Sequence, residues 1–284
     1  MPLLPESELA KLSPLFRGKA GHLLARTLRR LLSVKAVSDL NDRHAGLNGA
    51  GFAAAIIEDL GMDCLLGGGE KLSSLPDGPF ITVSNHPYGG MDGIVLVDLI
   101  GHHRSDFKVM VNEVLSLVEP LRKTWIVVNP RNGRQQTVTA RNIQGVKEVL
   151  STLREGHPVG FFPSGAVSDL SLREWRIRDR EWQESVLRLI QKAGVPILPV
   201  RFFDRNSMLF YLLGLIDWRI RVLRLPKEIV NKKGKTLRVG IGDLLSVEEQ
   251  AQHQDPADFG RWLRDKVDGM PRPEKFESFS LFLS

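Results

Sequence analysis

Short β-rich runs alternate with helical segments between residues 79 and 203, and this alternation constrains the fold more than any other feature. The β-rich runs are PFITVSN, TWIVVN, PVGFFPSG and VPILPVRFF. Between them lie MDGIVLVDLIG, TARNIQGVKEVLSTLREG and EWQESVLRLIQKAG, which read as helices. Strands that alternate with helices form parallel sheets with helical crossovers. The sequence therefore predicts an α/β fold with a mostly parallel central sheet flanked by helices.

The chain divides into three predicted parts: an N-terminal basic helical segment (1–50), one large domain (51–270) and a C-terminal tail (271–284). In residues 8–33, leucines recur at helical spacing and arginines cover the other face. Such a basic amphipathic helix can lie in a lipid interface, although packing on the protein's own core is commoner. Within residues 41–69, a second helix, GAGFAAAIIEDLG, is followed by a glycine-rich turn.

The net charge and the cysteine content limit the kinds of partner and site that the protein can have. The formal net charge is +6, which suits nucleic acid, anionic lipid or a phosphorylated molecule. The single cysteine, Cys64, excludes an internal disulfide and a cysteine-based metal cluster. No apolar run reaches the roughly 18 residues of a transmembrane helix, and the N-terminus lacks a signal-peptide pattern. If the protein meets a membrane, we expect it to lie on the surface.

The segment SNHPYGGMDG, residues 84–93, carries the strongest chemical signal. A strand delivers His86 into a glycine-containing turn, and Asp92 follows at the start of a predicted helix. A carboxylate can hold an imidazole in one tautomer, so that the imidazole takes a proton from an attacking hydroxyl. The plainer interpretations are a hydrogen-bonded surface histidine and an aspartate that caps the helix; Asp92 could do both.

Three further motifs follow in chain order: NPRNGR (129–134), FFPSG (161–165) and VPILPV (195–200). Arg131 and Arg134 suit a phosphate or carboxylate. Ser164 is not in the G-x-S-x-G elbow that exposes a nucleophile, so we expect a turn serine bonded to its own backbone.

This ordered set resembles the glycerolipid acyltransferase family, which contains the lysophosphatidic acid acyltransferases. The family's histidine–aspartate, arginine, Phe-Pro-Glu-Gly and Val-Pro motifs correspond to residues 85–92, 131 or 134, 162–165 and 195–199. Residues 204–218 are similar to its hemolysin-like branch, which includes enzymes implicated in making amino-acid-containing lipids. Three departures stand out. Five residues instead of four separate His86 from Asp92, and Ser164 replaces the usual glutamate. The arginine motif is offset, so that Arg131 and Arg134 both fit it.

The resemblance implies a membrane-surface O-acyltransferase, with residues 51–270 as the acyltransferase domain. An acyl group would pass from acyl-CoA or acyl carrier protein to the hydroxyl of a lysolipid, with His86 as general base and Asp92 orienting it. Substrate-binding positions are implied for Asn85, Arg131, Arg134, Pro163, Ser164 and Gly165. No metal or tightly bound cofactor is implied. We expect a cytoplasmic protein, peripheral on the inner face of the cell membrane.

Two rival interpretations remain open. The altered motifs are compatible with a non-catalytic lipid-binding protein that keeps the fold. The Arg-Trp-rich residues 172–183 and the +6 charge are compatible with a nucleic-acid-binding module, but no nucleic-acid-binding motif is present and we expect no nucleic-acid partner. The apolar, arginine-containing residues 207–224 fit an acyl-chain tunnel, a membrane-facing surface or core equally well.

Overall fold

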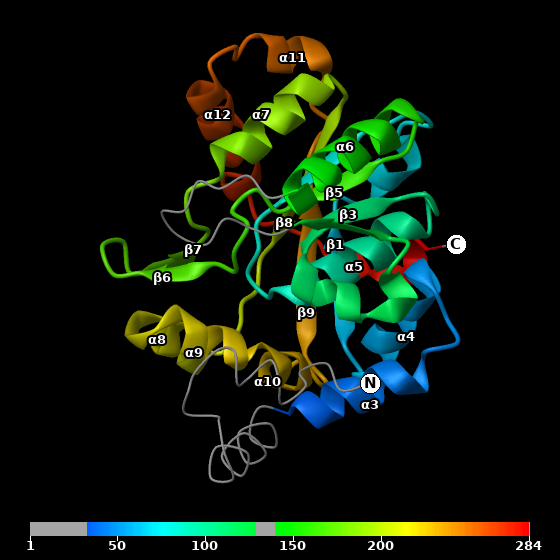
Figure 1. The fold of residues 1–284 in the computed structure, drawn as a ribbon, viewed down its shortest axis with the longest axis vertical. Helices are drawn as coiled ribbons and strands as arrows, with labels where there is room; N and C mark the ends of the chain where they lie inside the picture. The colour runs from blue at the N-terminus through cyan, green and yellow to red at the C-terminus, as the bar shows by residue number, and fades with distance from the viewer. Residues whose placement is uncertain (1–32, 129–139, 284) are drawn as a thin grey trace.

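A computed structural model describes residues 33–128 and 140–283, in which eight strands form one central sheet (Figure 1). The strand order is β10-β1-β9-β8-β2-β5-β3-β4. Within the described part of the chain, the antiparallel pairings of this sheet are β8 with β9 and β1 with β10; the others are parallel. The predicted mostly parallel α/β fold is confirmed. The strands are β1 (Asp63–Gly67), β2 (Ile81–Ser84), β3 (Lys108–Asn112), β4 (Trp125–Val128), β5 (Val159–Phe161), β8 (Ile197–Phe202), β9 (Thr236–Ile241) and β10 (Glu277–Ser278).

Helices cover both faces of this sheet (Figure 1). The helices are α3 (Val34–Arg43), α4 (Gly49–Asp59), α5 (Gly90–Gly101), α6 (Ala140–Arg154), α7 (Glu184–Ala193), α8 (Met208–Ile216), α9 (Trp218–Leu223), α10 (Leu225–Val230), α11 (Val247–Ala251) and α12 (Pro256–Asp268). Short 3₁₀ turns are η2 (Gly69–Ser74), η3 (Glu113–Leu117), η4 (Glu119–Leu121) and η5 (Phe279–Leu281). A hairpin of β6 (Asp169–Ser171) and β7 (Arg176–Arg178) stands outside the sheet. None of the helices described is long and apolar enough to cross a bilayer.

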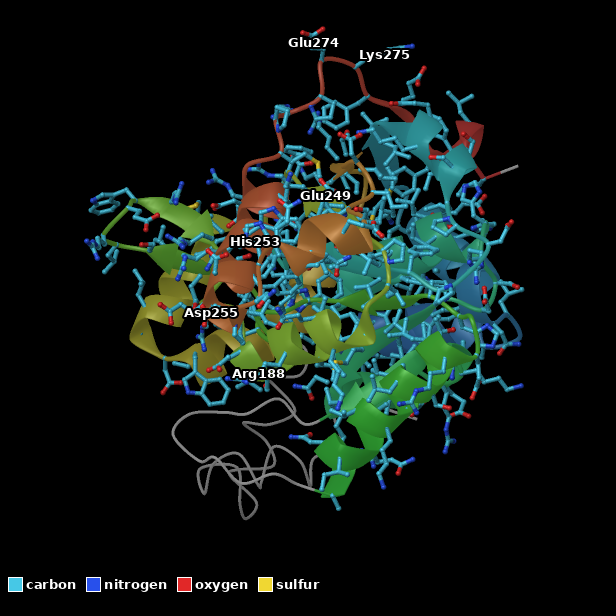
Figure 2. All side chains as sticks on the ribbon, turned by 90° about the horizontal axis from the view of Figure 1, so that it is seen from above. Arg188, Glu249, His253, Asp255, Glu274 and Lys275 are labelled. Atoms are coloured by element: carbon cyan, nitrogen blue, oxygen red, sulfur yellow. The ribbon has the colours of Figure 1, made fainter. Side chains whose placement is uncertain are left out.

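The sheet is buried on both faces, which explains why its strands read as continuous apolar runs. Helices α4 and α5 form one core layer with the inner strands, and α6, α7 and α12 form the other. Side chains alternate between the layers: on β8, Leu198 and Val200 face the first layer and Ile197 faces the second. The outer sides of the second layer are charged, as Arg188 and Glu249 show on α7 and α11 (Figure 2).

The structure corrects several expectations. The segment predicted as a helix and a glycine-rich turn also contains β1, and β3 was not predicted at all. The predicted boundary after residue 50 falls inside α4, and the predicted tail, 271–284, contributes β10 to the sheet through its pairing with β1. The predicted amphipathic helix at 8–33 lies, apart from Ser33, outside the described residues.

Candidate active site

A sharp turn joins the end of β2 at Ser84 to the start of α5 at Gly90. Gly89 within this turn has a φ of 82°, a left-handed region that glycine adopts without steric cost. A Cβ atom at this position would also lie 3.2 Å from Val167 Cγ2. Glycine at position 89 therefore lets the turn accommodate the five residues between His86 and Asp92.

Asp92, the third residue of α5, is fully buried, and one of its oxygens contacts three groups of the turn. Its Oδ2 accepts hydrogen bonds from Tyr88 N at 2.9 Å and Gly89 N at 3.0 Å. The same oxygen lies 2.9 Å from His86 Nδ1. Asp92 therefore caps the helix and faces the imidazole at once, the dual role that the sequence left open.

The electrostatics of this pair follow from its burial. Removal from water raises the pKa of the Asp92 carboxyl, while the His86 imidazole and the Tyr88 and Gly89 N–H groups act to lower it. Its second oxygen, Oδ1, is buried without a hydrogen-bond partner among the described residues, which adds to the cost of charging it. Because Nδ1 faces the carboxylate, Nε2 is the nitrogen of His86 that is left to meet a substrate.

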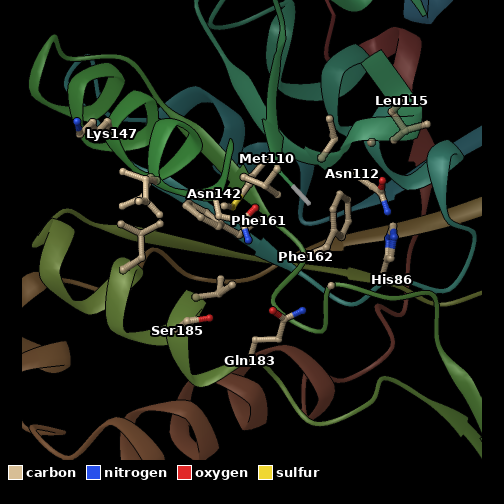
Figure 3. A pocket seen from close by; sticks show the side chains of 18 of the residues that line it. His86, Met110, Asn112, Leu115, Asn142, Lys147, Phe161, Phe162, Gln183 and Ser185 are labelled. Carbon is tan, nitrogen blue, oxygen red and sulfur yellow. The ribbon is translucent and has the colours of Figure 1, made fainter. Parts of the chain in front are cut away.

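His86 lines a cavity of about 350 Å³ between β3, β5, α6 and α7 (Figure 3). The lining is mostly apolar and includes Met110, Val146, Phe161, Phe162 and Leu189. Figure 3 shows His86 at one end of the cavity and Lys147 at the other. The Phe162 ring lies against the imidazole, with 4.4 Å between ring centroids. The arrangement places a histidine–carboxylate pair at one end of a space that suits a hydrocarbon chain.

Asp179 is a second buried carboxylate beside His86, and sequence reasoning missed it. Its Oδ1 accepts from the backbone N of His86 at 3.1 Å and from Ser168 Oγ at 2.5 Å. Ser168 N in turn donates to the carbonyl of His86 at 2.9 Å. Burial raises the pKa of Asp179, and the bond from Ser168 opposes that shift. Both backbone groups of His86 are thereby fixed by residues far along the chain, which no local pattern reveals.

Asn85 was predicted to contact substrate, but the structure places its amide against the neighbouring strand. Its Nδ2 donates to the carbonyl of Phe202 at 2.9 Å, and its Oδ1 accepts from Phe202 N at 2.8 Å. Asn85 thus joins the ends of β2 and β8, and its side-chain amide is engaged in holding the turn.

The FFPSG turn lies beside the cavity. Ser164 is buried, and its Oγ donates to the carbonyl of Ala166 at 2.8 Å, which confirms the prediction of a turn serine bonded to local backbone. Pro163 is buried, and its carbonyl accepts from Gln183 N at 2.9 Å. Gly165 lines the cavity with a φ of 61°. Of the predicted substrate-binding positions in this turn, Gly165 is therefore the one that borders the cavity.

Two predicted residues, Arg131 and Arg134, lie outside the described residues, so their predicted role in head-group binding stays a prediction. Within residues 33–128 and 140–283, no group of three or more histidine, cysteine or acidic side chains is arranged to hold a metal ion.

The protein matches one known family over most of its length. A family model described as acyltransferase matches residues 8–267. The chain belongs to this acyltransferase family. The prediction that the protein is an acyltransferase enzyme is thereby confirmed.

Individual relatives refine the comparison. The protein is 28% identical over 226 residues to a lyso-glycine lipid O-acyltransferase of Bacteroides thetaiotaomicron, covering 77% of this chain and 79% of the relative. It is 26% identical over 204 residues to a protein of the same name from Phocaeicola vulgatus, covering 69% and 70% of the two chains. The crystal structure of the 1-acyl-sn-glycerophosphate (LPA) acyltransferase PlsC from Thermotoga maritima matches more loosely, with a TM-score of 0.49 and 14% identity over 93% of this chain and 90% of that chain.

If Asp179 positions His86 through its hydrogen bonds, Asp179→Ala should lower kcat for acyl transfer by about tenfold to a hundredfold with little change in KM, because small displacements of a reacting group are costly. Asp179→Asn keeps an acceptor oxygen and should retain most of the rate. Steady-state kinetics and thermal melting of both variants measure this. Asp243→Ala, at an exposed carboxylate, is the control; equal rates for the Ala and Asn variants would contradict the role.

Proposed function

We propose that the protein transfers a fatty acyl chain from an acyl thioester, acyl-CoA or acyl carrier protein, to the hydroxyl of a lysolipid at a membrane surface. His86 is the general base and Asp92 its partner. The observation that carries the proposal is the 2.9 Å approach of His86 Nδ1 to the buried Asp92 carboxylate at one end of an apolar cavity. The family and its curated relatives support the reaction class.

The proposed chemistry conserves protons and requires no covalent enzyme intermediate. His86 Nε2 removes the proton of the acceptor hydroxyl while that oxygen attacks the thioester carbonyl. The tetrahedral intermediate expels the thiolate, which takes the proton back from the imidazolium. Asp92 keeps the proton on Nδ1 in the resting state and stabilises the imidazolium when it forms. Ser164, bonded to its own turn, has no part in this scheme.

The cavity supports a site for the acyl chain. Methylene groups gain free energy when they leave water for an apolar lining, and the lining from β3, β5, α6 and α7 is of that kind. A chain whose methyl end points away from His86 would keep its thioester carbonyl beside the imidazole. Lys147, on α6, provides a polar group at the end of the cavity away from His86 (Figure 3).

For the acceptor, we propose a lysolipid with an amino-acid head group. Both curated relatives are named lyso-glycine lipid O-acyltransferases, and residues 204–218 are similar to the same branch. Such a head group ends in a carboxylate, which arginine side chains recognise well; Arg131 and Arg134 remain the predicted candidates. Because acceptor and product are both lipids, we place the reaction on the inner face of the cell membrane, with the protein bound peripherally.

Replacement of the proposed base tests the chemistry. His86→Ala should lower the rate of thiol release from an acyl thioester in the presence of lysolipid by about 10²–10⁴-fold, the usual contribution of a general base. Melting temperature should fall modestly, since the ring is one of the groups that offset the burial of Asp92, so both proteins are assayed well below their melting temperatures. His103→Ala, at an exposed histidine, is the matched control. Full activity of His86→Ala would eliminate the mechanism, and lipid binding by the wild type without thiol release would favour a non-catalytic lipid-binding protein.

The pair should also determine the acid side of the pH profile. The base works only when unprotonated, and its partner only when charged. Because burial raises the pKa of Asp92, proton uptake by the pair, and with it the loss of activity, should begin at a higher pH than an exposed aspartate would allow. Asp92→Asn should be slower at every pH, by about 10²–10⁴-fold. A kcat–pH profile of Asp92→Asn that matches the wild type would contradict the pairing.

Filling the cavity should change chain-length preference. Val146→Trp places a large ring in the lining, so kcat/KM for long-chain thioesters should fall by about tenfold or more relative to short-chain ones. Val146 and Val247 are equally exposed, at 37%, so Val247→Trp on α11 serves as the control. An unchanged ratio of long-chain to short-chain activity would show that the acyl chain binds elsewhere.

A further inference from the structure

Helices α8 and α9 expose an unusual number of apolar side chains. On α8, the outer positions Met208, Leu209, Leu212, Leu215 and Ile216 are 44–75% exposed. These positions follow one side of the helix, and α9 exposes Trp218 and Val222, which lie one turn apart on the same side of that helix. The β6–β7 hairpin projects on the same side of the molecule (Figure 1), and Trp175 at its tip is 80% exposed. We call these outer residues of α8 and α9, together with Trp175, the docking face.

An uncovered surface of this kind calls for a partner. The sequence of α8, MLFYLLGLI, contains no charged residue, and its inner side is already filled by the fully buried Phe210 and Tyr211. A helix that is apolar all round is normally covered on every side. Large exposed apolar patches with a polar rim mark surfaces that bind a protein or a membrane.

The charge around the docking face favours an anionic partner. Residues 169–180 and 204–233 together carry a formal net charge of +5, against +6 for the whole chain. Residues 169–180 contain four arginines, of which Arg173, Arg176 and Arg180 are exposed. Arg176 and Arg178 form ion pairs with Glu174, and Arg180 forms one with Asp169. Aliphatic side chains beside tryptophans and arginines are the composition of surfaces that enter the boundary of an anionic bilayer.

The same charge argues against the other possible occupants. A second copy of the chain would bring an identical basic surface against this one, and like charges oppose such contact. Residues 1–32 carry a net charge of +4 and would meet the same repulsion. Nucleic acid would satisfy the arginines but offers no hydrocarbon layer for the leucines and isoleucines of α8 and α9.

Helix α8, which carries most of the docking face, also contacts the turn that holds His86. Tyr211, on the inner side of α8, donates from its OH to the carbonyl of Pro87, the residue after His86, at 3.2 Å. Helix α8 also packs against β6, and Phe210 and Tyr211 form a small core with Val167. The helix that meets the lipid would therefore be the one whose other side supports the turn that carries His86.

From these observations we propose that the docking face binds the protein to the surface of a bilayer that contains anionic lipids. The proposal rests on the proposed function and specifies which side of the molecule meets the membrane. The apolar side chains enter the interface, and the surrounding arginines pair with lipid head groups.

Sedimentation with vesicles tests the proposal directly on the full chain. A triple variant, Leu209→Gln, Leu212→Gln and Ile216→Gln, removes apolar area while it keeps good helix formers. It should bind phosphatidylglycerol-containing vesicles at least about tenfold more weakly than the wild type. Leu244→Gln, Val247→Gln and Leu281→Gln, at exposed positions elsewhere, form the matched control and should bind normally. Trp175→Gln, at the hairpin tip, weakens binding independently of any effect on α8.

Separate readouts keep this test distinct from that of the catalytic mechanism. Without vesicles, the α8 triple variant should turn over short-chain, water-soluble substrates as the wild type does. His86→Ala should bind vesicles normally, so full activity of that variant would sink the mechanism and leave the docking result intact. The docking proposal is overturned if the wild type does not sediment with anionic vesicles. It is also overturned if the α8 triple variant and Trp175→Gln both bind vesicles as tightly as the wild type does. It is equally overturned if only deletion of residues 1–32 abolishes binding, or if the α8 triple variant merely dissociates a dimer.

Discussion

One buried carboxylate oxygen organises the centre of this protein. Asp92 Oδ2 meets the His86 ring and the N–H groups of Tyr88 and Gly89 within 3.0 Å. Burying a charge without partners costs several kcal/mol, and these three groups offset that cost only while the turn keeps its shape. The shape of the turn and the orientation of the imidazole therefore depend on the same contacts, and any change that opens the turn also frees the His86 ring.

Segments far apart in the sequence hold that turn from outside. The amide of Asn85 joins it to β8, the Asp179–Ser168 pair fixes the backbone of His86, and Tyr211 reaches Pro87 from α8. Positioning of this kind suits a reaction in which small displacements of the base are costly. The side chain of Asn85 is engaged with the backbone of Phe202, so this residue helps to hold the turn in place, while other residues line the cavity.

The active site lies between two apolar environments with different purposes. On one side, the cavity between α6 and α7 is lined mostly by apolar side chains and suits a single hydrocarbon chain. On the other, the docking face on α8 and α9 is open and bordered by arginines. For an acyltransferase whose relatives act on a lysolipid, the first environment fits the chain that is transferred, and the second fits the surface from which the acceptor comes.

The sequence alone determined what depends on neighbouring residues. Alternating β-rich and helical runs predicted the parallel sheet. The short spacing from His86 to Asp92 placed both residues at the junction between one strand and the helix that follows it. The tertiary structure decided everything that depends on distant segments. Strands β1, β3 and β10 were recognised only through the strands they pair with. Asp179 accepts a hydrogen bond from the backbone of His86, 93 residues away, and the amide of Asn85 is bonded to Phe202. A cavity and an exposed helix face are likewise properties of packing, since whether an apolar side chain is core, lining or surface depends on what the rest of the chain places against it.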